Sequence, residues 1–212
     1  ANKIWNAFRF VMMNFDDDVD FGKVDESKFT VGDKWILSRI NTVAREVTEN
    51  LEKFELGIGL SKIYEFIWEE FCDWYIELVK PRLYDREAKD RLEALYVLNE
   101  VLKKAMKLLH PFMPFITEEI YSHLITDDES IMISSWPEYT EDILYPEEEK
   151  LMSFLMDSIR GVRNIRAEMN VPAGRKAKAY FVVKDQDIKE LIDQEKSTFS
   201  RLAGLSDIII KS

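Results

Sequence analysis

The stretch LSKIYEFIWEEFCDWYIELVKP (residues 60–81) carries bulky apolar residues at every third or fourth position, the spacing of one face of an α-helix. These residues are Leu60, Ile63, Ile67, Phe71, Trp74 and Leu78. Acids recur every four residues on another face and predict a solvated acidic surface; they are Glu65, Glu69, Asp73 and Glu77. Pro81 predicts the end of this helix, because proline cannot donate a backbone hydrogen bond.

The same spacing continues on both sides of this stretch. It predicts a helix over about 34–54 with Gly32 or Asp33 as its N-cap, a helix over 86–109, and one from Pro114 to about residue 126. Long amphipathic helices joined by short connections favour an antiparallel bundle. We therefore expect a mainly α protein of this type.

The pattern changes in the last third of the chain. Pro146 and the acids after it predict the start of a helix that runs to about residue 168. Short apolar runs at 178–184 and 207–211 predict strands around helical sequence at 186–203. We interpret the tail as a small α/β subdomain. The expected parts are a helical bundle (1–145), a connecting helix (146–172) and the α/β subdomain (173–212).

The charge is distributed unevenly along the chain. The 212 residues carry a net charge of −11, which argues against a general nucleic-acid binder, because such proteins usually carry a basic excess. Residues 159–178 are an exception, with six basic residues and one acid. A polyanion would therefore have to approach a local basic face.

The sequence contains no recognisable catalytic or metal-binding arrangement. Phosphate-binding and dinucleotide-binding glycine motifs, zinc-protease motifs and serine-hydrolase motifs are all missing. The single Cys72 and the two distant histidines cannot form a zinc cluster, and we interpret Cys72 as a packed thiol. We expect no catalytic residue, no metal and no cofactor in this chain. One cysteine, no apolar run of membrane-spanning length and no signal-peptide features predict a cytoplasmic protein without a membrane partner.

The first fifteen residues form a helix with two distinct faces. On a helical wheel the apolar face holds Ile4, Trp5, Phe8, Val11, Met12 and Phe15. The opposite face has no carboxylate and consists of Asn2, Lys3, Asn6, Arg9, Phe10 and Asn14. Amide and guanidinium groups can read base edges and phosphates, and an exposed Phe can stack on an unpaired base. An equally good interpretation is that the asparagines and Arg9 cross-link neighbouring helices.

The basic stretch 159–178 divides in the same way. The apolar face of its helix holds Leu151, Leu155, Ile159, Val162, Ile165 and Met169. Arg160 lies outside this face and Arg163 on its border, whereas Arg166 projects into it and predicts a half-buried structural ion pair. A further basic group follows this helix and consists of Arg175, Lys176 and Lys178. These side chains could reach a phosphate, although a solvated loop is the commoner explanation.

Five blocks carry a family resemblance. They are NKIWNAFRFVMMN (2–14), DKWILSRIN (33–41), YEFIWEEFCDWYIELVKPRLY (64–84), LLHPFMPFITEEIY (108–121) and RNIRAEMNVP (163–172). In this order and spacing they closely resemble bacterial valyl-tRNA synthetases, in the part that follows the catalytic core. The resemblance covers residues 1–172, and the tail fits less distinctly. Phe8 stands where the family more often has a small residue.

The resemblance implies an excised part of a class I aminoacyl-tRNA synthetase. This part would contain the anticodon-binding bundle but neither of the family's ATP-site signatures, so ATP would be a cofactor of the parent enzyme only. The implied partners are the anticodon arm of valine-specific tRNA and the catalytic core of the same polypeptide. By motif, the candidate tRNA-binding residues are Asn2, Asn6 and Arg9. The helical wheel alone adds Lys3 and Phe10, and Arg160 and Arg163 are second-rank phosphate contacts.

Two alternatives stay open at this point. The block FCDWYIELVKPRLY (71–84) favours the valine enzyme, but isoleucyl- and leucyl-type synthetases share the bundle and the block around His110. The chain could also be an interdomain scaffold whose arginines pair with carboxylates and do not touch RNA.

Overall fold

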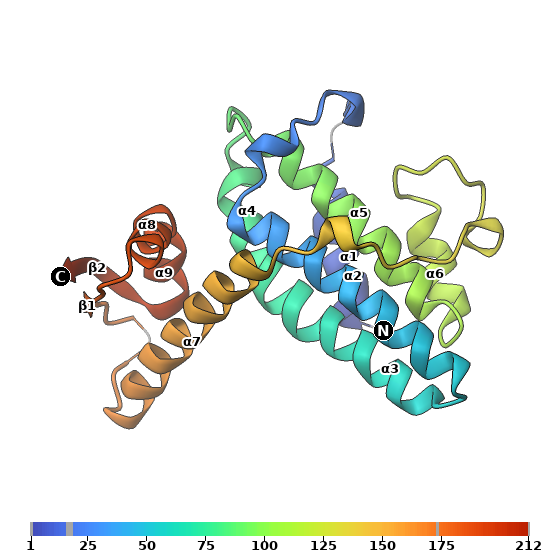
Figure 1. The fold of residues 1–212 in the computed structure, drawn as a ribbon. Coiled ribbons are helices and arrows are strands. Elements are labelled where there is room, and N and C mark those ends of the chain that lie inside the picture. Colours follow the sequence, from blue (N-terminus) through green and yellow to red (C-terminus); the bar gives the residue numbers. More distant parts are fainter. Residues whose placement is uncertain (1, 16–18, 173, 212) are drawn as a thin grey trace. The chain divides into compact units, whose positions relative to one another are not determined.

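A computed structural model describes residues 2–15, 19–172 and 174–211. The chain divides into two compact units, residues 1–146 and residues 147–212 (Figure 1). Each unit is described by itself below.

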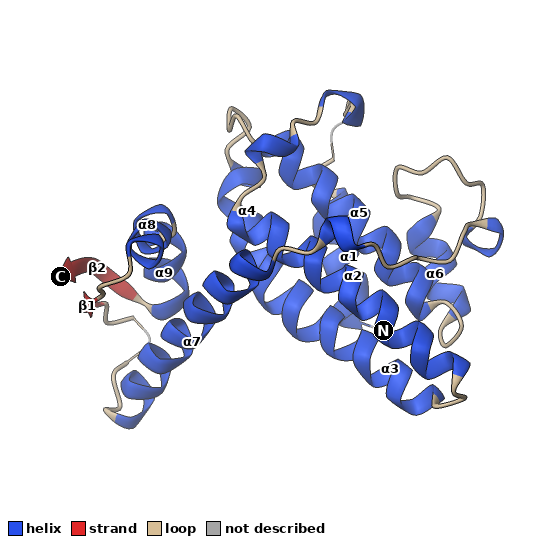
Figure 2. Cartoon of the chain, viewed as in Figure 1, coloured by secondary structure: helices blue, strands red, loops and turns tan. Residues whose placement is uncertain are grey.

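The first unit is a bundle of helices, which confirms the predicted mainly α architecture (Figure 2). Its long elements are α1 (Asn2–Met12), α2 (Val31–Glu52), α3 (Leu56–Glu65), the π-helix η3 (Phe66–Tyr75), α4 (Ile76–Tyr84), α5 (Arg91–Leu109) and α6 (Pro114–Tyr121). Two short 3₁₀ turns, η1 (Phe21–Lys23) and η2 (Glu26–Lys28), lie between α1 and α2. Two more follow α6: η4 (Ile131–Ile133) and η5 (Glu141–Ile143). Helix α2 packs on α3, η3 and α5, so α2 and α5 form the centre of the bundle.

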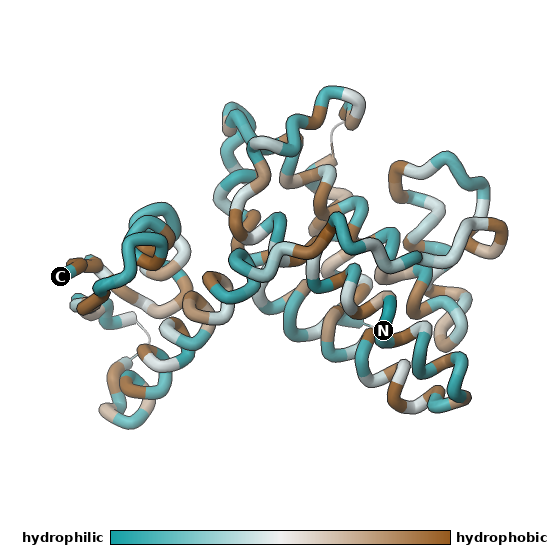
Figure 3. The backbone as a smooth tube through the Cα atoms, viewed as in Figure 1, coloured by the Kyte–Doolittle hydropathy of each residue, from teal (hydrophilic) through white to brown (hydrophobic). Residues whose placement is uncertain are grey.

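The centre is apolar because α5 is buried on nearly all sides. Its fully buried side chains include Leu95, Leu98, Val101, Leu102, Met106 and Leu108. The outer helices bury only one face, and hydrophilic and hydrophobic positions alternate along them in Figure 3. Helix α5 buries its apolar side chains and leaves its three lysines partly exposed, whereas the amphipathic outer helices lie on the surface.

The start of α2 differs from the predicted one. Thr30 is the N-cap, and its hydroxyl oxygen accepts a hydrogen bond from the Asp33 backbone N–H (3.2 Å), while the Asp33 carboxylate accepts one from the Thr30 N–H (2.9 Å). This reciprocal capping box places the helix start at Val31, so the predicted cap at Gly32 or Asp33 is wrong. The box aims the carboxylate of Asp33 into the bundle.

Asp33 is fully buried and ion-paired. Its two carboxylate oxygens accept hydrogen bonds from Arg82 Nη1 at 2.9 and 2.8 Å, and one of them also accepts the Tyr75 hydroxyl at 2.7 Å. Arg82 in turn pairs through Nε with the Asp90 carboxylate at 2.7 Å. We call these four residues the Asp33 network. It joins the start of α2 to η3, α4 and the start of α5.

The predicted helix end at Pro81 is wrong, because α4 continues to Tyr84. Proline costs about 3 kcal/mol in a helix interior. The residues after it offset this cost, since Arg82 belongs to the Asp33 network and Leu83 is buried. Tertiary contacts therefore hold the chain in a helix where the local sequence opposes it.

The second unit is small and mixed, as predicted. It contains most of α7 (Pro146–Glu168), followed by β1 (Ala177–Val182), α8 (Gln186–Gln194), α9 (Lys196–Ala203) and β2 (Leu205–Lys211). The two strands pair in parallel from Ala177 and Leu205 to Val182 and Lys211, with one irregularity after Ala177. Parallel strands need a crossover connection, and α8 and α9 supply it.

Candidate nucleic-acid interface

Helix α1 is rotated relative to the predicted orientation. Its buried side chains are Ile4, Ala7, Phe8 and Val11. Trp5, which was expected in the core, is 37% exposed, and its ring lies against Phe8 with 5.2 Å between ring centroids. The small Ala7 takes the interior position instead, and the buried arc turns toward it. The expectation that Phe8 faces the core is confirmed.

A continuous exposed strip follows from this rotation. It consists of Asn2, Trp5, Asn6, Arg9 and Met13, and we call it the α1 strip. Among the residues that the structure describes, the Arg9 side chain has no hydrogen-bond or ion-pair partner, and no carboxylate lies within ion-pairing distance of it. The strip therefore presents a free guanidinium, two amides and an indole ring on one face of one helix.

Lys3 and Phe10 lie on the flank of α1 that packs on η3, away from the strip. The Lys3 ammonium pairs with the Asp73 carboxylate at 2.6 Å and donates to the Trp68 carbonyl at 2.9 Å. Phe10 is half-buried, with the Lys80 ammonium 5.8 Å from its ring centroid. The expected exposure of the Phe10 ring is therefore wrong, because the neighbouring helix covers part of it.

Arg160 and Arg163 lie in the second unit and form a separate set. Arg160 pairs with Asp157, one turn earlier on α7, at 3.2 Å. Arg163 Nε donates to the Leu202 carbonyl at 2.7 Å, so it ties α7 to the end of α9. An exposed ion pair contributes at most about 1 kcal/mol to stability. Through the contacts with Asp157 and Leu202, both guanidinia are already engaged within their own unit.

Arg166 braces the tail, although not through the predicted ion pair. Its guanidinium donates to the carbonyls of Gly204 (3.2 Å) and Pro172 (3.4 Å). Gly204 adopts a left-handed conformation (φ 66°), and a Cβ at this position would lie 3.2 Å from Arg166 Nη2. The apolar face of α7 also ends earlier than expected, since Ile165 is 60% and Met169 72% exposed.

The basic residues of the loop and strand start that follow α7 are exposed. Within the described parts of the chain, no hydrogen bond or ion pair involves the side chains of Arg175, Lys176 and Lys178. These three cations agree with the predicted solvated loop and strand start. They remain available to an anion.

Comparison with known protein families identifies the family of the chain. A family model described as the anticodon-binding domain of tRNA ligase matches residues 33–181, which is more than half of the chain. The chain belongs to this family.

Curated relatives extend the match to nearly the whole chain. It is 50% identical to a valine–tRNA ligase of Clostridium perfringens and 47% identical to one of Clostridium acetobutylicum, each over 98% of the chain. A valine–tRNA ligase of Bacillus thuringiensis is 42% identical over 100% of the chain. In each case the chain spans about a quarter of the relative's length. The alignments also cover the tail, so the resemblance extends beyond residue 172.

Two specific features are absent from the residues that the structure describes. No group of three or more potential ligands lies close enough together to hold a metal ion in residues 2–15, 19–172 and 174–211. In the same ranges, no helix is both long enough and apolar enough to cross a membrane. His110 Nδ1 lies 2.7 Å from the Thr117 hydroxyl oxygen, a contact between the end of α5 and α6.

Cys72 is expected to be an unreactive thiol. Burial raises its pKa to about 11, and only the thiolate is nucleophilic. Near pH 8, alkylation by iodoacetamide should therefore be roughly two orders of magnitude slower in the folded chain than in urea. Mass spectrometry of the alkylated fraction over time measures this ratio. Equal rates in the two states would show that the thiol is neither shielded nor shifted in pKa.

Proposed function

We propose that this chain is the anticodon-binding region of a valine–tRNA ligase and that it binds the anticodon arm of valine-specific tRNA. The match of the family model to residues 33–181 carries this proposal. The names of the curated relatives support the valine enzyme over the isoleucine and leucine enzymes. Proteins recognise such an arm by stacking on, and hydrogen-bonding to, the unpaired bases of its loop.

The residues proposed for this task fall into two ranks. Asn2, Asn6 and Arg9 come first, because they are exposed on one face and the Arg9 side chain has no partner in the described parts of the chain. Lys3, Phe10, Arg160 and Arg163 come second, because contacts inside the protein already engage them. The proposed division places the bundle at 1–145, the connecting helix at 146–172 and the small subdomain at 173–212.

The chemistry of aminoacylation is proposed for the rest of the parent polypeptide. A valine–tRNA ligase joins valine to its tRNA with ATP, and the catalytic core of the same polypeptide would be the second partner of this chain. We expect the parent enzyme to act in the cytoplasm. By itself, the 212-residue chain should not activate valine, which an ATP–pyrophosphate exchange assay measures.

The anticodon itself provides the test. The chain should bind a valine-specific tRNA transcript more tightly than the same transcript with a changed anticodon. Loss of one well-stacked base is worth roughly 1–3 kcal/mol, or about 5- to 160-fold in Kd. Filter binding of the two transcripts at one salt concentration measures the ratio. Equal Kd values would contradict anticodon recognition, because the two transcripts differ nowhere else.

A scaffold without RNA contact is the competing proposal. The contacts of Lys3 with Asp73 and of Arg163 with Leu202 favour it, because they give basic residues structural roles. It predicts that neither transcript binds at low salt. Any measurable binding that depends on the anticodon would rule it out.

A further inference from the structure

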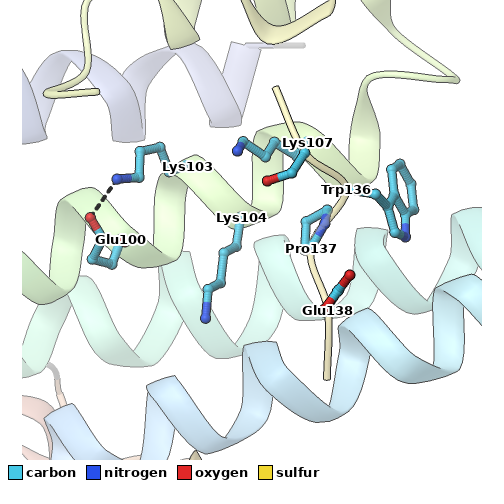
Figure 4. A pocket seen from close by; sticks show the side chains of 8 residues that line it. Glu100, Lys103, Lys104, Lys107, Trp136, Pro137 and Glu138 are labelled. Carbon is cyan, nitrogen blue, oxygen red and sulfur yellow. Dashed lines mark hydrogen bonds and ion pairs between the residues drawn. The ribbon is translucent and has the colours of Figure 1, made fainter. Parts of the chain in front are cut away.

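A pocket of about 420 Å³ lies between the second half of α5 and the segment 135–138. Three lysines of α5 line one side: Lys103, Lys104 and Lys107. The segment contributes Trp136, Pro137 and Glu138 to the other side (Figure 4). The pocket is large enough for one nucleotide, since pockets for small ligands begin at about 300 Å³.

The lysine wall contains one ammonium without a partner. Lys103 pairs with Glu100 at 2.6 Å, and Lys107 lies 3.7 Å from the Asp128 carboxylate. Lys104 forms no hydrogen bond or ion pair with any residue that the structure describes. Burial lowers the pKa of Lys104, and the charges of Lys103 and Lys107 act in the same direction against that of Glu100. An anion beside Lys104 would offset both the burial and the repulsion between these cations.

A rigid aromatic ring forms the opposite wall. The Trp136 indole N–H donates to the Thr48 hydroxyl oxygen on α2 at 2.8 Å, and the Thr48 hydroxyl donates to the Ala44 carbonyl at 2.7 Å. The Asn41 side chain holds the following segment by accepting from the Thr140 N–H at 3.0 Å. Trp136 is half-buried and lines the pocket. A ring fixed in this way can stack on a base at little cost in conformational entropy.

The groove continues beyond this pocket. A second hollow of about 240 Å³ shares Lys107, Ser135 and Trp136 with the first and extends to His110. Trp136 therefore lies between two neighbouring hollows. This arrangement suits a strand of linked nucleotides better than one free nucleotide.

We propose that this pocket binds one unpaired nucleotide of an RNA strand, with its phosphate beside Lys104 and its base against Trp136. The inference rests on the proposed tRNA-binding function and adds a contact outside the α1 strip. Glu138 is exposed and, within the described residues, has no ion-pair partner. Its carboxylate is an acceptor, and an exocyclic amino group offers two N–H donors at the edge of a base, whereas uracil offers only its ring N3–H, so the pocket favours a base with an amino group over uracil.

The test uses short single-stranded RNA and the Lys104→Met variant. Fluorescence anisotropy should show that the wild-type chain binds labelled oligoadenylate more tightly than labelled oligouridylate. Lys104→Met keeps the length of the side chain and removes the charge. It should weaken oligoadenylate binding and lower the slope of log K against log salt by about 0.7, the value for one phosphate contact on a single strand. Circular dichroism checks that the variant folds.

Lys53→Met is the matched control, because Lys53 is an exposed lysine at the end of α2 that does not line the pocket. This variant should bind as the wild type does. Equal affinity and equal salt slope for Lys104→Met and wild type would contradict RNA binding in the pocket, as would no binding of oligoadenylate. Neither result changes the outcome expected in the anticodon test. Conversely, Lys104-dependent binding of oligoadenylate without anticodon discrimination would support the pocket and remove the proposed function.

Discussion

Replacing Asp33 with asparagine should lower the free energy of unfolding by about 3–5 kcal/mol, the usual cost of breaking a buried ion pair. Asp33 is fully buried, and its carboxylate accepts two hydrogen bonds from Arg82 and one from Tyr75. Asparagine keeps the shape but leaves the Arg82 guanidinium without its buried counter-ion. Urea unfolding followed by far-UV circular dichroism measures the change.

Asp73→Asn is the matched control for this prediction. Asp73 also pairs with one cation, Lys3, but its side chain is mostly exposed. Solvent screens such a pair, so its loss should cost at most about 1 kcal/mol. If the two variants lose equal stability, the Asp33 network does not stabilise the bundle more than an ordinary surface contact.

Tyr75→Phe separates the hydrogen bond from the ion pair. Burial, and after it the charge of Asp33, raises the pKa of the Tyr75 hydroxyl well above its usual value, so the group is a neutral donor over the working range of the protein. Removing a hydrogen bond to a charged acceptor should cost about 1.5–3 kcal/mol. The loss should therefore be smaller than that for Asp33→Asn.

Arg9→Ala should weaken the binding of valine-specific tRNA by about 1–3 kcal/mol, or about 5- to 160-fold in Kd. Arg9 is exposed on the α1 strip and has no side-chain partner in the described residues, so the substitution removes no internal contact there. If Arg9 meets a phosphate, the slope of log K against log salt should fall by about 1. Filter binding at several salt concentrations measures both quantities.

Two further variants sharpen the Arg9 result. Arg9→Lys keeps the charge but not the planar fork of donors, so it should restore the salt slope but not a bidentate contact to a base. Lys53→Ala removes one exposed charge elsewhere on the bundle and should change Kd little. If Arg9→Ala binds tRNA as the wild type does, with the same salt slope, the α1 strip is not the site.

Helix positions were largely predictable from the sequence. The predicted helix from Pro146 to about residue 168 agrees with α7 (Pro146–Glu168), and the predicted strands overlap β1 and β2. Apolar periodicity and helix-start signals act over a few residues, so they can be read without knowledge of the fold. The family blocks were equally visible, because they are local strings.

The misplaced start of α2 is a local error, because Thr30 and Asp33 are three residues apart. Other wrong predictions depend on residues far away in the sequence. The helix continues past Pro81 because Arg82 reaches Asp33, 49 residues earlier. Lys3 is occupied because Asp73 lies 70 residues later. Trp5 is exposed because the bundle accepts the smaller Ala7 in the interior. A helical wheel gives the relative angles on a helix, but the packing partner decides how the helix is rotated.

The sequence by itself determined the fold class, the places of most helices and strands, and the family, since local spacing and local strings carry these. The tertiary structure alone decided which cations are free. It leaves the Arg9 side chain without a partner among the described residues, engages Lys3 and Arg163, and brings Lys104 and Trp136 to opposite walls of one pocket. The physical reason is that an ion pair or a pocket joins residues distant in sequence, and only packing brings them within reach.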